Sequence, residues 1–80
     1  NYPNPFNPVT AISFNLPVPG YVKLEIYNLL GEIVEVIVNS NLGAGTHSFE
    51  WDGAAYSSGV YFYKIAASGF TETKKMILIK

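Results

Sequence analysis

Hydrophobic and polar residues alternate along much of the chain, and this alternation predicts short β-strands. Residues 10–16 and 21–27 show the pattern most clearly. Their large apolar residues are expected on the inward face: Ile12, Phe14, Leu16, Val22, Leu24 and Ile26. Lys23 and Glu25 are expected on the outward face. Residues 17–20, with two prolines and a glycine, separate the two segments, and the spacing of an amphipathic helix occurs nowhere over a useful length.

Four further segments have the composition of strands, and together they indicate the fold class. They are residues 33–38, 46–51, 60–67 and 70–79. Residues 33–38 are apolar on both faces except at Glu35, so the pattern leaves the orientation of this strand open. The glycine- and asparagine-rich residues 39–45 predict a loop. An all-β protein follows, a small immunoglobulin-like antiparallel β-sandwich of about six to seven strands, with an open barrel as the alternative.

The turn residues predict how the last two strands pair. A two-residue loop at Ser68 and Gly69 places Ala67 opposite Phe70 and Tyr61 opposite Met76. Earlier in the chain, Gly31 can supply the positive φ of a bulged hairpin loop.

The second face of this last hairpin is polar near its loop but apolar at its far end. Four residues make it so: Val60, Phe62, Ile77 and Ile79. One interpretation is that the N-terminal segment or the other sheet covers them. The other is that they form a docking surface for a partner, by strand addition if the last strand lies at a sheet edge.

Composition limits what such a domain can do. With 80 residues, 49% of them hydrophobic, and no cysteine, the chain has material for one core and no disulfide to support it. All basic residues are lysines and the formal charge is −1, so we expect no nucleic-acid partner. No apolar run approaches the ~20 residues of a membrane-spanning helix. The first residue is Asn1, which suggests a C-terminal piece of a longer chain.

Residues able to support chemistry are few. His47 is the only histidine and shares a strand face with Phe49 and Trp51, so we expect a packed or rim residue and no catalytic triad. Glu50 and Asp52 share the opposite face, which we expect to be solvated.

A few residue types in the chain could in principle bind a metal or a sugar. Oxygen ligands for Ca²⁺ could come from Asp52 or from Asn39 and Asn41, but the carboxylates lack EF-hand spacing. We therefore expect no catalytic residue, no metal and no cofactor. Tyrosines could stack on sugar rings if an exposed row forms, and the candidates are Tyr21, Tyr27 and Tyr56.

Several segments, in their order and spacing, resemble one family across essentially the whole chain. They are residues 1–8 (NYPNPFNP), 27–32 (YNLLGE), 43–47 (GAGTH), 51–53 (WDG), 58–64 (SGVYFYK) and 70–80 (FTETKKMILIK). The chain thus resembles the C-terminal sorting domains of cargo proteins of the type IX secretion system of Gram-negative bacteria. The WDG and SGVY features also resemble an immunoglobulin-like domain of the flagellar hook-capping protein. Glu32 and Lys64 stand where an arginine is frequent in the sorting domains.

The resemblance implies a function and a set of partners. A domain of this kind follows the cargo domain of a secreted protein and folds in the periplasm. An outer-membrane translocon and a shuttle protein recognise it, and a sortase-like peptidase often removes it as the cargo reaches the cell surface or medium. We expect one domain over residues 1–80, with a proline-rich lead-in at 1–9 and the sandwich at 10–80, and a monomer when isolated.

The final strand carries recognition in that family, which gives the candidate partner-binding residues here. They are Lys74, Lys75, Met76, Ile77, Leu78, Ile79 and Lys80, to which the hairpin argument adds Phe62. Two alternatives remain open for the function: an accessory carbohydrate-binding or adhesion module of a secreted enzyme, and a structural spacer.

Overall fold

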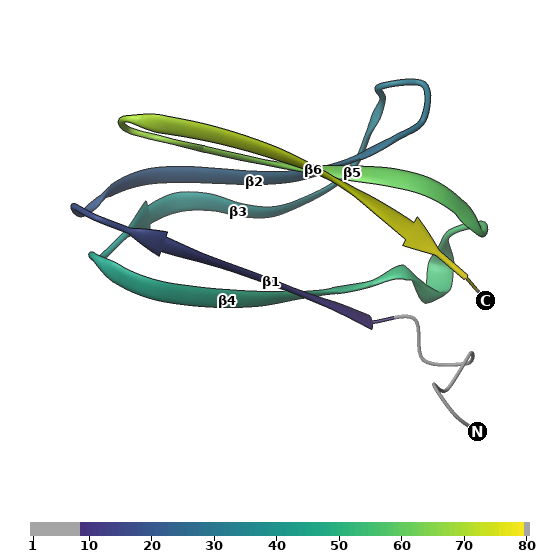
Figure 1. The fold of residues 1–80 in the computed structure, drawn as a ribbon, viewed down its shortest axis with the longest axis horizontal. Helices are drawn as coiled ribbons and strands as arrows, with labels where there is room; N and C mark the ends of the chain where they lie inside the picture. The colour runs from purple at the N-terminus through teal and green to yellow at the C-terminus, as the bar shows by residue number, and fades with distance from the viewer. Residues whose placement is uncertain (1–8, 80) are drawn as a thin grey trace.

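Two antiparallel β-sheets packed face to face make up the part of the chain that the computed structural model describes, residues 9–79 (Figure 1). The smaller sheet pairs β1 (Val9–Leu16) with β4 (Gly45–Asp52). The larger sheet has four strands in the order β3 (Ile33–Leu42), β2 (Gly20–Asn28), β5 (Gly59–Ala67) and β6 (Phe70–Leu78). A single 3₁₀ turn, η1 (Gly53–Ala55), follows β4. The predicted all-β sandwich is confirmed.

The core lies between the sheets and is built from the alternate residues of each strand. Its buried members are Ile12, Phe14, Leu16, Val22, Leu24, Ile26, Val38, Trp51, Tyr61, Ile65, Met76 and Leu78. All six apolar residues expected inward in the first two strands belong to it. Period-two alternation was therefore a reliable guide to the inner faces of β1 and β2.

The last hairpin has the predicted register. Ala67 pairs with Phe70 and Tyr61 pairs with Met76. Gly69 has a φ of 92°, a conformation that favours glycine and that the two-residue turn requires. Among the described strands β6 pairs only with β5, so it is an edge strand of the larger sheet.

The loop predicted at residues 39–45 is shorter than expected and comprises only residues 43 and 44. Residues 39–42 continue β3, with Asn39 opposite Lys23 and Asn41 opposite Tyr21, and β4 already begins at Gly45. Backbone pairing with β2 holds these polar residues in the strand despite their low β-propensity, because a sheet neighbour outweighs intrinsic preference.

Two irregularities in the β2–β3 pairing decide the orientation that the sequence left open. The register shifts between Leu24 and Glu25 and again between Ile26 and Tyr27. As a result Val38 faces the core, whereas Glu35 lies opposite the buried Ile26. Bulges of this kind change which residues face inward, so inward and outward residues do not alternate regularly along β3.

Glu25 lies on the outer face of the larger sheet, as expected, but its side chain is buried there. It is 6% exposed, its carboxylate accepts a hydrogen bond from the Tyr27 hydroxyl at 2.7 Å, and Lys23 Nζ lies 3.5 Å from it. The long side chains of Lys23 and Tyr27 on the same face cover the Glu25 carboxylate, and Lys23 compensates its charge. Residues 1–8, where Tyr2 and Phe6 are expected to hold the lead-in, and Lys80 lie outside the described residues.

Candidate partner-binding surface

The end of β6 alternates between residues held in the core and residues left in solvent. Met76 and Leu78 are buried. Ile77 and Ile79, with the opposite parity, are 65% and 70% exposed. The smaller sheet therefore does not cover these two isoleucines, and they remain candidates for a docking surface.

The turn that follows β4 packs closely against Leu78. A Cβ atom added to Gly53 would meet Leu78 Cδ1 at 2.6 Å, closer than side chains tolerate. Gly53 is thus needed for close approach, since its φ is not in the left-handed region. This contact anchors the end of β6, and the anchor directs Ile77 and Ile79 outward.

The other residues of the predicted site are spread over different surfaces. Lys75 lies opposite Phe62 on the outer face, where Phe62 is half-buried. Lys74 lies opposite Tyr63, on the other face, with its Nζ 3.5 Å from the Glu72 carboxylate. The eight predicted residues thus divide into core anchors, outer-face residues and one lysine on the opposite face, with Lys80 outside the described part.

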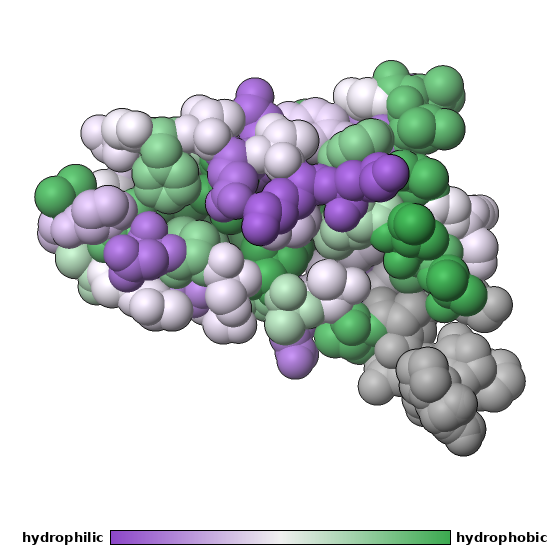
Figure 2. Space-filling model, in the orientation of Figure 1, coloured by the Kyte–Doolittle hydropathy of each residue, from purple (hydrophilic) through white to green (hydrophobic). Residues whose placement is uncertain are grey.

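A second group of exposed apolar residues lies at the same end of the molecule. Leu29 and Leu30, in the turn between β2 and β3, are 68% and 82% exposed, and Ile33 follows them in solvent. Figure 2 shows hydrophobic surface both over this turn and over the end of β6. The sequence analysis missed these residues. The available signal was a pair of leucines inside a turn, where polar residues are usual.

The β2–β3 turn is held by one asparagine. The Asn28 carboxamide oxygen accepts hydrogen bonds from the backbone N–H groups of Leu30 at 2.9 Å and Glu32 at 3.0 Å, and its Nδ2 donates to the Glu32 carboxylate. Backbone bonds join Asn28 to Gly31 and Glu32 as well, and Gly31 has the predicted positive φ, 84°. The turn therefore presents its leucines in one conformation.

Glu35, the acidic residue on the inner face of β3, takes part in a network of hydrogen bonds. Its carboxylate accepts a hydrogen bond from Trp51 Nε1 at 3.1 Å. The Tyr56 hydroxyl lies within hydrogen-bonding distance of the same carboxylate and of the Val34 carbonyl. Burial and then the Glu35 carboxylate raise the pKa of Tyr56. The rings of Trp51, Tyr56 and Tyr61 pack with centroids 5.2–6.3 Å apart.

The residues considered for catalysis or metal binding have structural contacts. His47 packs against Phe14 and Phe49, and its Nε2 lies 2.7 Å from the Gly43 carbonyl oxygen. Asp52 caps η1 by accepting from a backbone N–H group, and Glu50 is exposed. Within residues 9–79, no three His, Cys, Asp or Glu side chains gather as a metal site would require, and no helix could span a membrane.

The tyrosines proposed for sugar stacking do not form an exposed row. Tyr21 is exposed, Tyr27 is half-buried with its hydroxyl on Glu25, and Tyr56 packs against the core residue Trp51. The hydrogen bond to Glu25 and then burial raise the pKa of Tyr27. Their arrangement gives no support to a carbohydrate platform.

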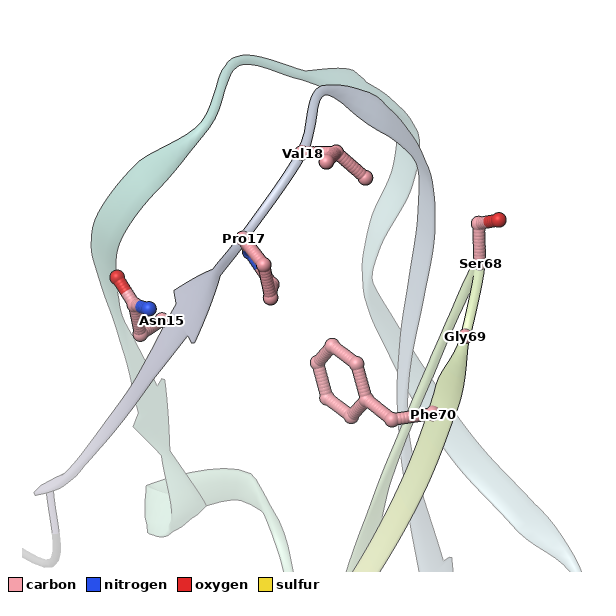
Figure 3. Close-up of a pocket in the computed structure, with 6 residues that line it drawn as sticks. All are labelled: Asn15, Pro17, Val18, Ser68, Gly69 and Phe70. Carbon is pink, nitrogen blue, oxygen red and sulfur yellow. The ribbon is translucent and has the colours of Figure 1, made fainter.

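At the opposite end of the molecule, a hollow opens between the β1–β2 connection and the β5–β6 turn. Its volume is about 480 Å³, and Asn15, Pro17, Val18, Ser68, Gly69 and Phe70 line it. Figure 3 shows the Phe70 ring directed into it, toward Pro17. The lining is mainly apolar and has no titratable side chain, so the hollow lacks the groups that acid–base chemistry requires.

Comparisons with known proteins agree with this architecture. The family model described as the secretion system C-terminal sorting domain matches residues 1–80. The crystal structure of FlgD from P. aeruginosa is similar with a TM-score of 0.63 and 28% sequence identity, over 88% of this chain and 60% of that one. This chain therefore spans less than two thirds of that protein. A search of curated protein sequences finds no match.

Proposed function

Because the chain belongs to the family of secretion system C-terminal sorting domains, whose model matches residues 1–80, we propose that it directs an attached cargo through the type IX outer-membrane translocon to the cell surface or medium. The domain acts as a sorting signal and carries out no catalysis. It passes through the periplasm, a shuttle protein and the translocon bind it, and a sortase-like peptidase removes it as the cargo reaches the cell surface or medium.

One observation supports the proposed role of the C-terminal strand most directly. β6 is an edge strand in which Met76 and Leu78 are buried in the core while Ile77, and Ile79 directly after the strand, are exposed. An edge strand offers unpaired backbone groups to an added strand, and its exposed side chains supply specificity. We propose that Ile77, Ile79 and the neighbouring outer-face residues Lys75 and Phe62 contact the machinery, together with Lys74 and Lys80.

The residues of the predicted site have two different roles under this proposal. Met76 and Leu78 act through the fold, because they are buried and hold β6 against the core. Deleting the end of β6 would remove both roles at once, so point substitutions are the informative variants. We further propose that residues 1–80 form one sorting domain, with a lead-in at 1–9 and the sandwich at 10–80, and that it is a monomer when isolated.

A secretion assay tests the function. Residues 1–80 are fused behind a reporter that carries a periplasmic export signal and expressed in a bacterium with a type IX system and in a translocon-deficient mutant. We expect the reporter outside the cell only where the system is intact. Reporter retained in the periplasm of both strains would refute the proposal, provided that the domain is folded there, as judged by resistance to proteolysis.

The role of β6 is tested with exposed positions alone. Ile77→Ser and Ile79→Ser together should block secretion without unfolding the domain, because both side chains already lie in solvent. Val18→Ser, at the other end of the molecule and 53% exposed, is the matched control and should secrete normally. Equal secretion of both variants would show that the exposed side of β6 is not read.

A further inference from the structure

The exposed apolar residues on the larger sheet and its turn are concentrated toward one end. Of the nine large hydrophobic residues exposed in the described chain, six belong to this end or to the adjacent outer face of the sheet. They are Leu29, Leu30, Ile33, Val36, Ile77 and Ile79. Clustering of this kind marks an interaction surface more often than single exposed residues do.

The β2–β3 turn and β6 belong to one continuous surface. Across the outer face, the register places Ile33 opposite Tyr27, Tyr27 opposite Phe62 and Phe62 opposite Lys75 on β6. Figure 1 shows the turn rising from the larger sheet on the side away from β1 and β4, at the same end as the C-terminus. A partner on β6 can therefore reach the turn without crossing the core or the other sheet.

The shape of the turn indicates the shape of its partner. Leu30 is 82% exposed, and the hydrogen bonds that Asn28 Oδ1 accepts from the backbone N–H groups of Leu30 and Glu32 hold the turn with its leucines away from the sheet. Two rigidly held, protruding leucines form a convex apolar element with little conformational entropy left to lose on binding. Such an element fits a concave apolar site.

The charge of the same face indicates the chemistry around that concave site. Lys23, Lys64 and Lys75 lie on the outer face of the larger sheet. By register the one acid among the paired residues of that face is Glu25, which is buried and beside Lys23, and the exposed Glu32 of the turn accepts a hydrogen bond from Asn28 Nδ2. The whole chain has a formal charge of −1, so this basic face is a local feature. It complements carboxylates at the rim of a partner site.

From these observations we propose that the Asn28–Glu32 turn is a second recognition element for the export machinery, in addition to β6. Its partner is a protein surface with an apolar hollow that receives Leu29 and Leu30 and with acidic residues at its rim. This inference rests on the proposed function, since it concerns the same partner contact. It adds a requirement that recognition by the C-terminal strand alone does not have.

The test substitutes the turn and leaves β6 intact. In the secretion assay, Leu29→Ser with Leu30→Ser should lower the secreted fraction about tenfold, the loss typical of truncating an interface anchor. The control, Val18→Ser with Tyr21→Thr, changes two apolar residues that are also exposed, at 53% and 51%, but lie at the other end of the molecule, and should secrete normally. Urea unfolding of both purified variants should match that of the unaltered domain.

The failure of this inference can be separated from failure of the proposed function. If the unaltered fusion is secreted and the turn variant is secreted equally well, the turn is not read although the domain remains a sorting signal. A second experiment changes the charge of a lysine in β6. Lys75→Glu should reduce secretion, whereas Lys75→Arg should preserve it. Equal secretion of these two variants would refute the acidic rim of the partner site.

A membrane is the competing occupant, and vesicles distinguish it from a protein. Flotation of the purified domain with vesicles of phosphatidylcholine and phosphatidylglycerol should leave it unbound. If the domain instead floats with the vesicles and Leu29→Ser with Leu30→Ser abolishes this, the apolar end inserts into lipid and the protein partner proposed here is wrong.

Discussion

Replacing Glu35 tests whether the inner carboxylate of β3 is what fastens the aromatic cluster. Its carboxylate accepts the hydrogen bond of Trp51 Nε1, and Trp51 is 1% exposed. Glu35→Ala removes this acceptor, and water has little access to the indole N–H group. The Tyr56 hydroxyl keeps the Val34 carbonyl as a partner, so the unsatisfied group is that of Trp51.

The expected magnitude follows from the burial of that donor. Leaving a buried N–H group unpaired costs about 1–3 kcal/mol, so we expect Glu35→Ala to lower the free energy of unfolding by about 2 kcal/mol. For a domain of this size, this corresponds to a fall in Tm of about 10 °C. Glu35→Gln keeps a neutral acceptor and should cost about half as much, because a charged acceptor strengthens the bond.

Urea unfolding measures these differences directly. Trp51 is the only tryptophan, so its fluorescence reports the unfolding of the core, and circular dichroism follows variants that lack it. Glu50→Ala is the matched control, since it removes the same charge from an exposed position of β4 and should change stability by less than about 0.5 kcal/mol.

A double-mutant cycle isolates the interaction. With Trp51→Phe the donor is gone, so Glu35→Ala in that background should cost about 2 kcal/mol less than in the unaltered chain. If the two substitutions are strictly additive, or if Glu35→Ala matches the Glu50 control, then the Glu35–Trp51 hydrogen bond does not stabilise the cluster and our account of β3 is wrong.

Three further predictions concern close packing, the turn and pH. Gly53→Ala should destabilise the domain by about 1–3 kcal/mol because its Cβ displaces Leu78, and urea unfolding of a matched Ala54→Gly variant, with less effect, is the comparison. Asn28→Ala should cost about 1 kcal/mol and should speed amide exchange within the β2–β3 turn, whereas unchanged exchange would contradict the rigid turn. The raised pKa values of Tyr27 and Tyr56 contribute stability that is complete below about pH 10 and is lost as pH rises further, because the unfolded chain releases its phenolic protons first. Replacing both tyrosines with phenylalanine should flatten this alkaline decline in urea titrations, and an unchanged slope would rule out their contribution.

Alternation and turn residues along the chain predicted most of the strands and the pairing of the last two. Ile12, Phe14 and Leu16 had to share a face, and a two-residue loop at Ser68 and Gly69 dictated the register of the last hairpin, which the structure confirms. These features depend on neighbours close in sequence, so local pattern and turn chemistry suffice to predict them. The same local pattern also indicated that Ile77 and Ile79 lie on the outer side of the last hairpin.

Only the tertiary structure decided the features that depend on residues far apart in the chain. The two register shifts between β2 and β3 turned Glu35 toward Trp51, and no periodicity within β3 alone predicts a bulge. Pairing with β2 extended β3 through residues 39–42, which their composition had marked as a loop.

The candidate surface shows the same division. Local sequence marked β6 as apolar on both sides, but its place at a sheet edge depends on the order of four strands, which is a non-local property. The proximity of Leu29 and Leu30 to that edge likewise arises because β2 lies beside β5, which joins the two hairpins in one sheet. The sequence by itself determined the inner faces of β1 and β2 and the register of the last hairpin, and the pairing of distant strands decided the orientation of β3 and which exposed residues share a surface.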